Sequence, residues 1–462
     1  MTEISSKWTN YFAFDKQVSI TPLIIYRIIF GVLMLFGVSR FLFKGWVQQL
    51  YIDPQFYFGY LGFEWVKPLP GNWMYLPFIL MLLAAIGITI GYLYRYSAFV
   101  FFLCFTYVEL LDKSNYLNHY YFVSLMSFLM VLVPANAKFS VDALRNPSIR
   151  RDTTSQWHIG ILKFQLAVVY IFAGIAKLNS DWLFHAEPLR TWLQAHHTIP
   201  FFGQFLQMKE TAYLFSWFGC LYDLFIVFFL LTAKTRKFAY LFVVGFHLIT
   251  WYLFPIGVFP WVMIFSTLIF FSNEFHEKVL TFLKRMLCIT QQENVPGGKS
   301  SGQTNPLVLI FLVIYMAAQI TLPFRYTLYP GDLFWNEEGF RFSWRVMLMH
   351  KEGYATFYVK DKATGRTAQI DNTHYLTQTQ IDQMSTQPDM ILQYARFLKT
   401  KYDGRTFSFG EKEITITDPS VHAEVYVSLN GRPSQLFIDR KHDLTTLPYN
   451  LSHRNWIEPF TP

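Results

Sequence analysis

Nine long apolar runs constrain the fold of this chain more than any other feature of its sequence. A membrane-spanning helix needs about 20 consecutive apolar residues, because the hydrocarbon core of a bilayer is roughly 30 Å thick. The expected spans lie at residues 20–43, 75–94, 97–111, 118–135, 157–178, 211–232, 237–253, 256–273 and 306–324. We therefore predict a polytopic α-helical membrane domain of about nine helices over residues 1–324.

The charged residues agree with this interpretation. They make up 15% of the 462 residues, whereas soluble domains contain about 25%. The net charge is +8, but the basic residues lie mostly in short loops, where they set the topology and do not indicate nucleic-acid binding. The positive-inside rule places the lysine- and arginine-rich loops and the N-terminus in the cytoplasm. Everything after residue 323 is then expected on the exoplasmic side.

From residue 325 onward the composition is that of a water-soluble domain, and we predict an exoplasmic α+β domain over residues 325–462. Strands are expected at residues 340–348, 354–359, 367–370, 413–417 and 423–429, and a helix at residues 377–401. Asn430-Gly431 is a strong turn signal. Residues 291–303 are expected to form a flexible loop before this domain.

Cysteine usage argues against several kinds of site. Cys104, Cys220 and Cys288 form no C-x-x-C pair, which makes a disulfide framework, a dithiol centre or a zinc site unexpected. His196-His197 has no Cys, Asp or Glu partner at ligand spacing, so we predict no metal.

Three polar residues at the ends of apolar runs are candidate functional groups. Lys177 lies where the fifth run meets a polar loop, and charged residues inside membrane helices tend to be functional; the alternative is a lysine that reaches the headgroups. Asn118 and His119 begin the fourth run. Asn118 is a good helix cap, and His119 is either an interfacial histidine or a group that transfers protons. In the predicted topology these residues lie on the side of the soluble domain.

Several motifs resemble the vitamin K-dependent gamma-carboxylase family in order and spacing. They are L-D-K-x₄-N-H at residues 111–119, A-G-x₂-K-L-x₂-D-W at residues 173–182 and F-x-I-G-x-F at residues 254–259. The likeness continues at residues 67–75, 140–142, 322–323, 342–344 and 427–430, and at Trp335 and Arg432. It covers nearly the whole chain.

The resemblance implies an enzyme that oxidises vitamin K hydroquinone, or a related lipid quinol, with O₂ to the epoxide. The strong base formed in that reaction removes a γ-hydrogen from a glutamate of a secreted peptide or protein, and the carbanion captures CO₂. Lys177 matches the base that deprotonates the quinol, a role that partial burial of the amine would favour. Asn118 and His119 match the pair that stabilises the oxyanion.

Further residues are assigned by the same resemblance. Phe259, Met263 and His247 match positions near the quinone. The residues that match peptide- and glutamate-binding positions are Trp335, Phe340, Trp344, Met347 and Arg432. Trp344 is equally consistent with a core position, and Arg432, which follows a turn, is expected to be exposed.

The chain also departs from the animal members of the family. Those continue past the point where this chain ends, join a membrane loop to the soluble domain by a disulfide, and have tyrosine at the position of Phe340. We therefore expect a bacterial homologue in the inner membrane, or a protein of the ER membrane if it is eukaryotic. The alternatives are a quinol epoxidase that does not carboxylate protein and a non-enzymatic transport or receptor protein on the same fold.

Overall fold

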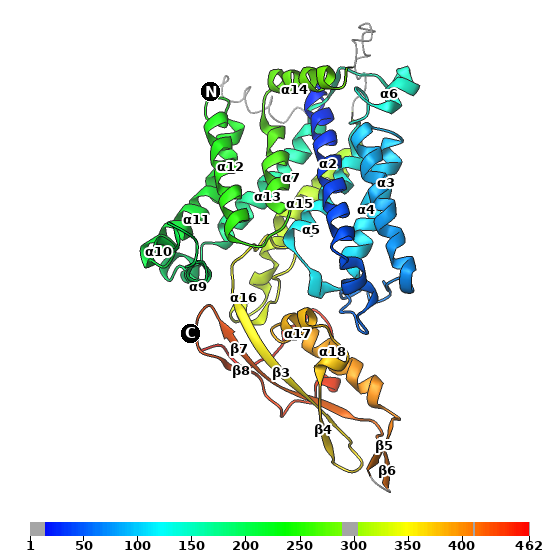
Figure 1. Ribbon diagram of the computed structural model, residues 1–462, viewed down its shortest axis with the longest axis vertical. Helices are drawn as coiled ribbons and strands as arrows, with labels where there is room; N and C mark the ends of the chain where they lie inside the picture. The colour runs from blue at the N-terminus through cyan, green and yellow to red at the C-terminus, as the bar shows by residue number, and fades with distance from the viewer. Residues whose placement is uncertain (1–13, 289–303, 410–411, 462) are drawn as a thin grey trace.

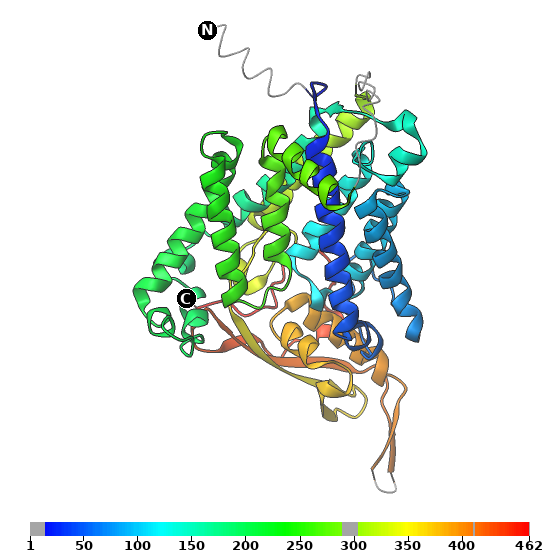
Figure 2. The same cartoon turned by 45° about the horizontal axis from the view of Figure 1, so that its top comes forward.

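The structure is a computed structural model that describes residues 14–288, 304–409 and 412–461. A bundle of helices forms one part, and a mixed α/β domain lies against one end of it (Figure 1 and Figure 2). The loop predicted at residues 291–303 lies outside the described residues.

Each of the nine apolar runs contains helix. The helices are α2 (Thr21–Phe43), α3 (Tyr75–Ile90), α4 (Tyr94–Leu111), α5 (Asn118–Leu132), α7 (Gln156–Ala176), α11 (Lys209–Leu231), α12 (Arg236–Leu253), α13 (Phe259–Ser266) and α15 (Pro306–Thr321). Within the described ranges, six helical segments are long and apolar enough to cross a membrane: Thr21–Phe43, Gly71–Ile90, Tyr94–Leu111, Gln156–Ala176, Lys209–Leu231 and Pro306–Leu328. The chain is therefore a polytopic helical membrane protein, whereas spanning by α5, α12 and α13 stays a prediction.

The opposite end of the bundle has a different character. Helix α14 (Asn273–Met286) lies across that end, far from the α/β domain (Figure 1). Lys284 and Arg285 lie in its last turn. A short antiparallel pair, β1 (Gln17–Ser19) with β2 (Thr153–Ser155), joins the approaches to α2 and α7. One end of the bundle thus carries these basic residues and the other is covered by the α/β domain, whereas the side of the membrane that each end faces stays a prediction.

The α/β domain is built on a four-stranded antiparallel sheet in the order β4-β3-β7-β8. Its strands are β3 (Lys351–Lys360), β4 (Thr367–Ile370), β7 (Ser420–Leu429) and β8 (Gln435–Ile438). The predicted hairpin is confirmed, with Phe357 opposite Ile370, and Asn430 and Gly431 both have the positive φ angles of a tight turn. Helices α17 (Gln378–Met384) and α18 (Pro388–Tyr402) replace the single predicted helix. Pro388, at the start of α18, lacks the N–H that a continuous helix would need.

The strand predicted at residues 340–348 is wrong. This segment is irregular, and Phe342, Trp344 and Met347 have φ angles of +61°, +59° and +53°. Such angles are strained for residues with a side chain and persist only where surrounding contacts hold them. Here the Phe342 and Trp344 rings pack on Tyr121 of α5, at centroid distances of 4.9 and 5.0 Å. The apolar side chains at alternate positions therefore do not form one face of a sheet; Phe342 and Trp344 instead contact the membrane domain.

Polar contacts fix the α/β domain to the loop between α4 and α5. Lys113, whose side chain is 1% exposed, forms an ion pair with Asp389 of α18 at 2.7 Å, and Arg341 binds the same carboxylate at 2.8 Å. Burial opposes ionisation of Asp389, but the two cations outweigh it and hold its pKa below the usual range. Asp112 accepts a hydrogen bond from Gln380 of α17 at 2.7 Å. The L-D-K motif is therefore a docking site for the soluble domain.

Candidate functional site

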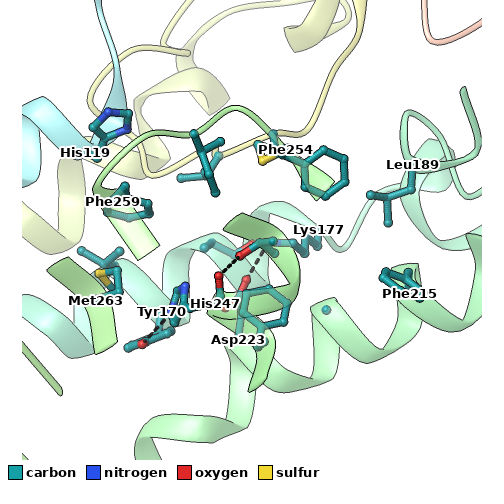
Figure 3. A pocket seen from close by; sticks show the side chains of 18 of the residues that line it. His119, Tyr170, Lys177, Leu189, Phe215, Asp223, His247, Phe254, Phe259 and Met263 are labelled. Carbon is teal, nitrogen blue, oxygen red and sulfur yellow. Dashed lines mark hydrogen bonds and ion pairs between the residues drawn. The ribbon is translucent and has the colours of Figure 1, made fainter. Parts of the chain in front are cut away.

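A cavity lies where the helix bundle meets the α/β domain. It encloses about 900 Å³ of space free of protein atoms, part of which is open to solvent. Its wall is formed mainly by apolar and aromatic side chains from α7, α11, α12 and α13, with Val346 and Met347 contributed by the soluble domain. Figure 3 shows these side chains converging on Lys177 and Asp223. A cavity of this size and character suits an apolar ring compound.

Lys177 and Asp223 form the charged centre of the cavity. The Lys177 Nζ lies 2.6 Å from Asp223 Oδ2, and both side chains are only 7% exposed. Nζ also donates to the carbonyl of Ala173 at 3.3 Å and lies 5.3 Å from the centre of the Trp182 ring. Lys177 is therefore not a lysine that reaches the headgroups; it is buried and paired across two helices.

Local sequence explains why the chain turns at this point. Helix α7 ends at Ala176, and Lys177 is its C-terminal cap residue. The side chain of Asn179 then accepts a hydrogen bond from the Trp182 backbone N–H and caps the short helix α8 (Ser180–Phe184). The Trp182 indole donates to the Ser216 carbonyl of α11 at 2.8 Å, which fixes the ring beside Lys177.

His119 lies across the cavity from this pair (Figure 3). Its ring stacks on Phe259 with a centroid distance of 5.2 Å and an interplanar angle of 27°. No other described residue forms a hydrogen bond with its ring nitrogens, so they are available to a ligand. The neighbouring Asn118 does not line the cavity: its amide donates to the Arg345 carbonyl at 3.0 Å and accepts from Tyr116 at 3.1 Å. Asn118 thus holds the soluble domain beside His119.

The residues assigned to quinone binding all line this cavity: Phe259, Met263 and His247. His247 Nε2 is 3.1 Å from the Tyr170 hydroxyl, which is in turn 3.3 Å from the Thr267 hydroxyl (the first contact is shown in Figure 3). Thr267 donates to the Met263 carbonyl at 2.7 Å. One side of the apolar cavity is therefore formed by a chain of hydrogen-bonded polar groups.

The residues assigned to peptide binding are not brought together. Met347 lines the cavity, whereas Trp335 and Trp344 are each 1% exposed and belong to buried cores. The Trp335 indole donates to the Glu458 carbonyl at 2.8 Å. Phe340 packs on Phe334 at a centroid distance of 6.4 Å and does not line the cavity.

Arg432 has a partner that sequence reasoning did not identify. Its guanidinium donates to both carboxylate oxygens of Asp181, at 2.9 and 2.7 Å, and Asn430 donates to Asp181 at 2.7 Å. Its side chain is 24% exposed, less than we expected for a residue after a turn. Burial alone would raise the pKa of Asp181, but the hydrogen bonds from Arg432 and Asn430 bring it below its usual range. The Arg432–Asp181 ion pair therefore links the soluble domain to helix α8, which also contains Trp182.

Asp223 is the functional candidate that sequence reasoning missed. A signal was present, because a single aspartate interrupts the apolar run at residues 211–232 and charged residues are rare in membrane helices. Spacing could not reveal its partner, since 46 residues separate it from Lys177. Among the residues with coordinates, no group of three or more His, Cys, Asp or Glu side chains is placed to hold a metal ion.

Comparison with known families gives a match for each part of the chain. Residues 15–275 match the HTTM domain, and residues 304–462 match the family described as vitamin K-dependent gamma-carboxylase, lumenal domain. The first match covers the helix bundle as far as the start of α14, and the second covers α15 and the α/β domain. No solved structure matches the chain.

Proposed function

Because this chain belongs to the vitamin K-dependent gamma-carboxylase family, we propose that it couples oxidation of a lipid quinol by O₂ to carboxylation of peptide glutamate. The observation that supports this proposal best is the buried Lys177–Asp223 ion pair in a largely apolar cavity. Burying an ion pair costs desolvation free energy that the attraction between the charges often does not repay, and charged groups within membrane helices tend to be functional. The cavity also borders the soluble domain, through which a polar peptide could approach from the exoplasmic water.

In this proposal the pair, and not the lysine alone, handles the quinol proton. The sequence offered a base without a visible partner, but the Lys177 Nζ lies 2.6 Å from the Asp223 carboxylate. Asp223 can take the ammonium proton, which leaves a neutral amine facing the cavity. That amine accepts the proton of a quinol hydroxyl, as a general base positioned within hydrogen-bond distance of its substrate.

The remaining residues position the substrates. His119 lies opposite the pair and can donate a hydrogen bond to the oxyanion that forms when the quinol loses its proton. Phe259, Met263 and His247 hold the ring from the side of the membrane. Asn118 and the Lys113–Asp389 pair keep the soluble domain against the cavity.

The stoichiometry sets the assay. One quinol and one O₂ give one epoxide and one water, while one glutamate and one CO₂ give one carboxyglutamate and one proton. The purified protein is incubated with reduced vitamin K, O₂, labelled bicarbonate and a glutamyl peptide, and epoxide and fixed label are measured separately. We expect both products. Absence of both would refute the proposal.

One observation favours the alternative of epoxidation without protein carboxylation. Arg432, the residue expected to receive the substrate carboxylate, is already bound to Asp181 through both terminal nitrogens. If this pair does not open, another cation must bind the glutamate, or no peptide is used. Epoxide without fixed label across several glutamyl peptides would establish this alternative.

A further inference from the structure

A second cavity lies on the far side of the His119–Phe259 stack. It encloses about 870 Å³ of space free of protein atoms, part of it open to solvent, which is close to the 900 Å³ of the first cavity. His119 and Phe259 line both cavities, so the stacked pair is a wall that the two share. Apart from this wall, the second cavity is formed by α2, α3, α4 and α5, together with α13.

Two charged side chains line this second cavity. Glu109 of α4 accepts a hydrogen bond from Ser124 at Oε2 (2.5 Å), whereas its Oε1 is buried without a hydrogen-bond partner. The guanidinium of Arg40 on α2 lies 4.7 Å from the centre of the Trp46 ring. Neither side chain forms an ion pair with any other residue that the structure describes. Most other lining residues are apolar, and several are aromatic, including Phe78 and Phe105.

A buried carboxylate oxygen without a donor is costly, and charged groups at membrane depth usually face a ligand or a partner. The two cavities contain the same chemical types: one cation, one carboxylate and aromatic walls. In the first cavity the cation and the carboxylate bind each other. In the second they do not, so an acceptor and a donor remain for the oxygens of a bound molecule.

We propose that the second cavity binds a second quinol ring, with a ring hydroxyl donating to Glu109 and a ring oxygen accepting from Arg40. This inference rests on the proposed function for the type of ligand. It also predicts selectivity when Glu109 is ionised: a quinol then has hydroxyl hydrogens to donate to the carboxylate, whereas the oxidised quinone has none. The second cavity should therefore prefer the reduced form and hold it next to the reaction cavity.

Two glycines allow each cavity to be filled separately. A Cβ at Gly37, on the wall of the second cavity, would have its nearest neighbour, a Val258 methyl group, at 4.0 Å. A Cβ at Gly219, on the wall of the first cavity, would meet Trp182 at 3.7 Å and Phe246 at 3.9 Å. Both are ordinary contacts on spanning helices, so Gly37→Phe and Gly219→Phe are matched variants.

The experiment is an anaerobic titration of the whole chain in lipid nanodiscs with radiolabelled 2-methyl-1,4-naphthohydroquinone, corrected with empty discs. Without O₂ the quinol is bound but not consumed. We expect two molecules per chain in the wild type and one in each glycine variant. Glu109→Gln should still bind two, but its affinity for the reduced form at one site should fall by about 10- to 100-fold, as expected for loss of a hydrogen bond to a charged group.

The results separate this inference from the proposed function. One molecule per chain in the wild type, or two in Gly37→Phe, would overturn the second site. Loss of both molecules in Gly37→Phe would mean a single composite site and would also overturn it. A higher affinity of the second cavity for the oxidised quinone than for the quinol would overturn the role of Glu109. Two bound quinols in a protein that forms no epoxide would leave the site standing and refute the enzyme.

Discussion

The Lys177–Asp223 pair makes a quantitative prediction about stability. Both side chains are 7% exposed and their charged atoms are 2.6 Å apart, so removal of one partner leaves an uncompensated buried charge. Breaking a buried ion pair in this way costs about 3–5 kcal/mol. Replacing both partners with apolar residues of similar size is often close to neutral. We therefore expect Lys177→Met and Asp223→Leu each to cost about 3–5 kcal/mol, and the double variant to cost less than either.

A native cysteine provides the probe. Cys220 is buried on α11, three residues before Asp223, and its thiol lies 3.8 Å from the Gly174 carbonyl of α7. Maleimide can label it only when the α7–α11 contact opens. Cys104 and Cys288 are changed to serine so that Cys220 is the only cysteine left. At 1.36 kcal/mol per tenfold change, each single variant should label about 150- to 5,000-fold faster than the parent.

The double variant is the control for helix packing. If the two single effects simply add in Lys177→Met/Asp223→Leu, the charges are not coupled and the reasoning fails. Single variants that label within about fivefold of the parent would show that water already screens the pair. Both single variants should also form epoxide about 10²- to 10⁴-fold more slowly, because each lacks part of the proposed base.

Three other outcomes are expected. Lys177→Ala should lower epoxide formation by about 10²- to 10⁴-fold, and added small amines should restore part of it; near-normal turnover would refute the base. Because the folded-state pKa of Asp181 is depressed, its contribution to domain docking should be complete above about pH 4 and be lost as the pH falls through the folded-state pKa. Asp181→Asn should lack this contribution at every pH. The protease sensitivity of the soluble domain measures both effects. Arg432→Gln should weaken peptide carboxylation more than peptide-free epoxidation, whereas His119→Ala should lower both; if Arg432→Gln and Asp181→Asn behave alike, Arg432 serves only docking.

The membrane domain was largely predictable because its helices follow from composition. Runs of apolar residues give helices wherever the backbone must satisfy its own hydrogen bonds, and the predicted run at residues 157–178 differs from α7 by only one or two residues at each end. The number of membrane-spanning helices was harder to predict from the sequence. Residues 256–273 contain the short helix α13, which starts late at Phe259 and gives way to a 3₁₀ turn at Thr267, so length alone does not show whether it crosses the bilayer.

The soluble domain shows where local pattern fails. Residues 354–359 form a strand as predicted, because their alternation reflects one buried and one exposed sheet face. Residues 340–348 alternate for a different reason, since successive side chains meet different partners: Phe340 packs on Phe334 of the α/β domain, and Arg341 binds Asp389. Trp344 stacks on Tyr121, while Met347 reaches the cavity. A pattern of period two cannot distinguish these cases, because the partner surface is remote in sequence.

In the site, individual polar residues could be predicted from the sequence, but their partners could not. Lys177 and His119 could be identified one at a time, because each interrupts an apolar run near its end. Their chemistry depends on partners, and partners are a property of helix packing. Asp223 makes Lys177 one half of a buried ion pair, and Asp181 forms an ion pair with Arg432. Both of these partners, Asp223 and Asp181, are single acidic residues in or beside apolar runs of the sequence. Each of them, like Glu109, can be found in the sequence as such a residue.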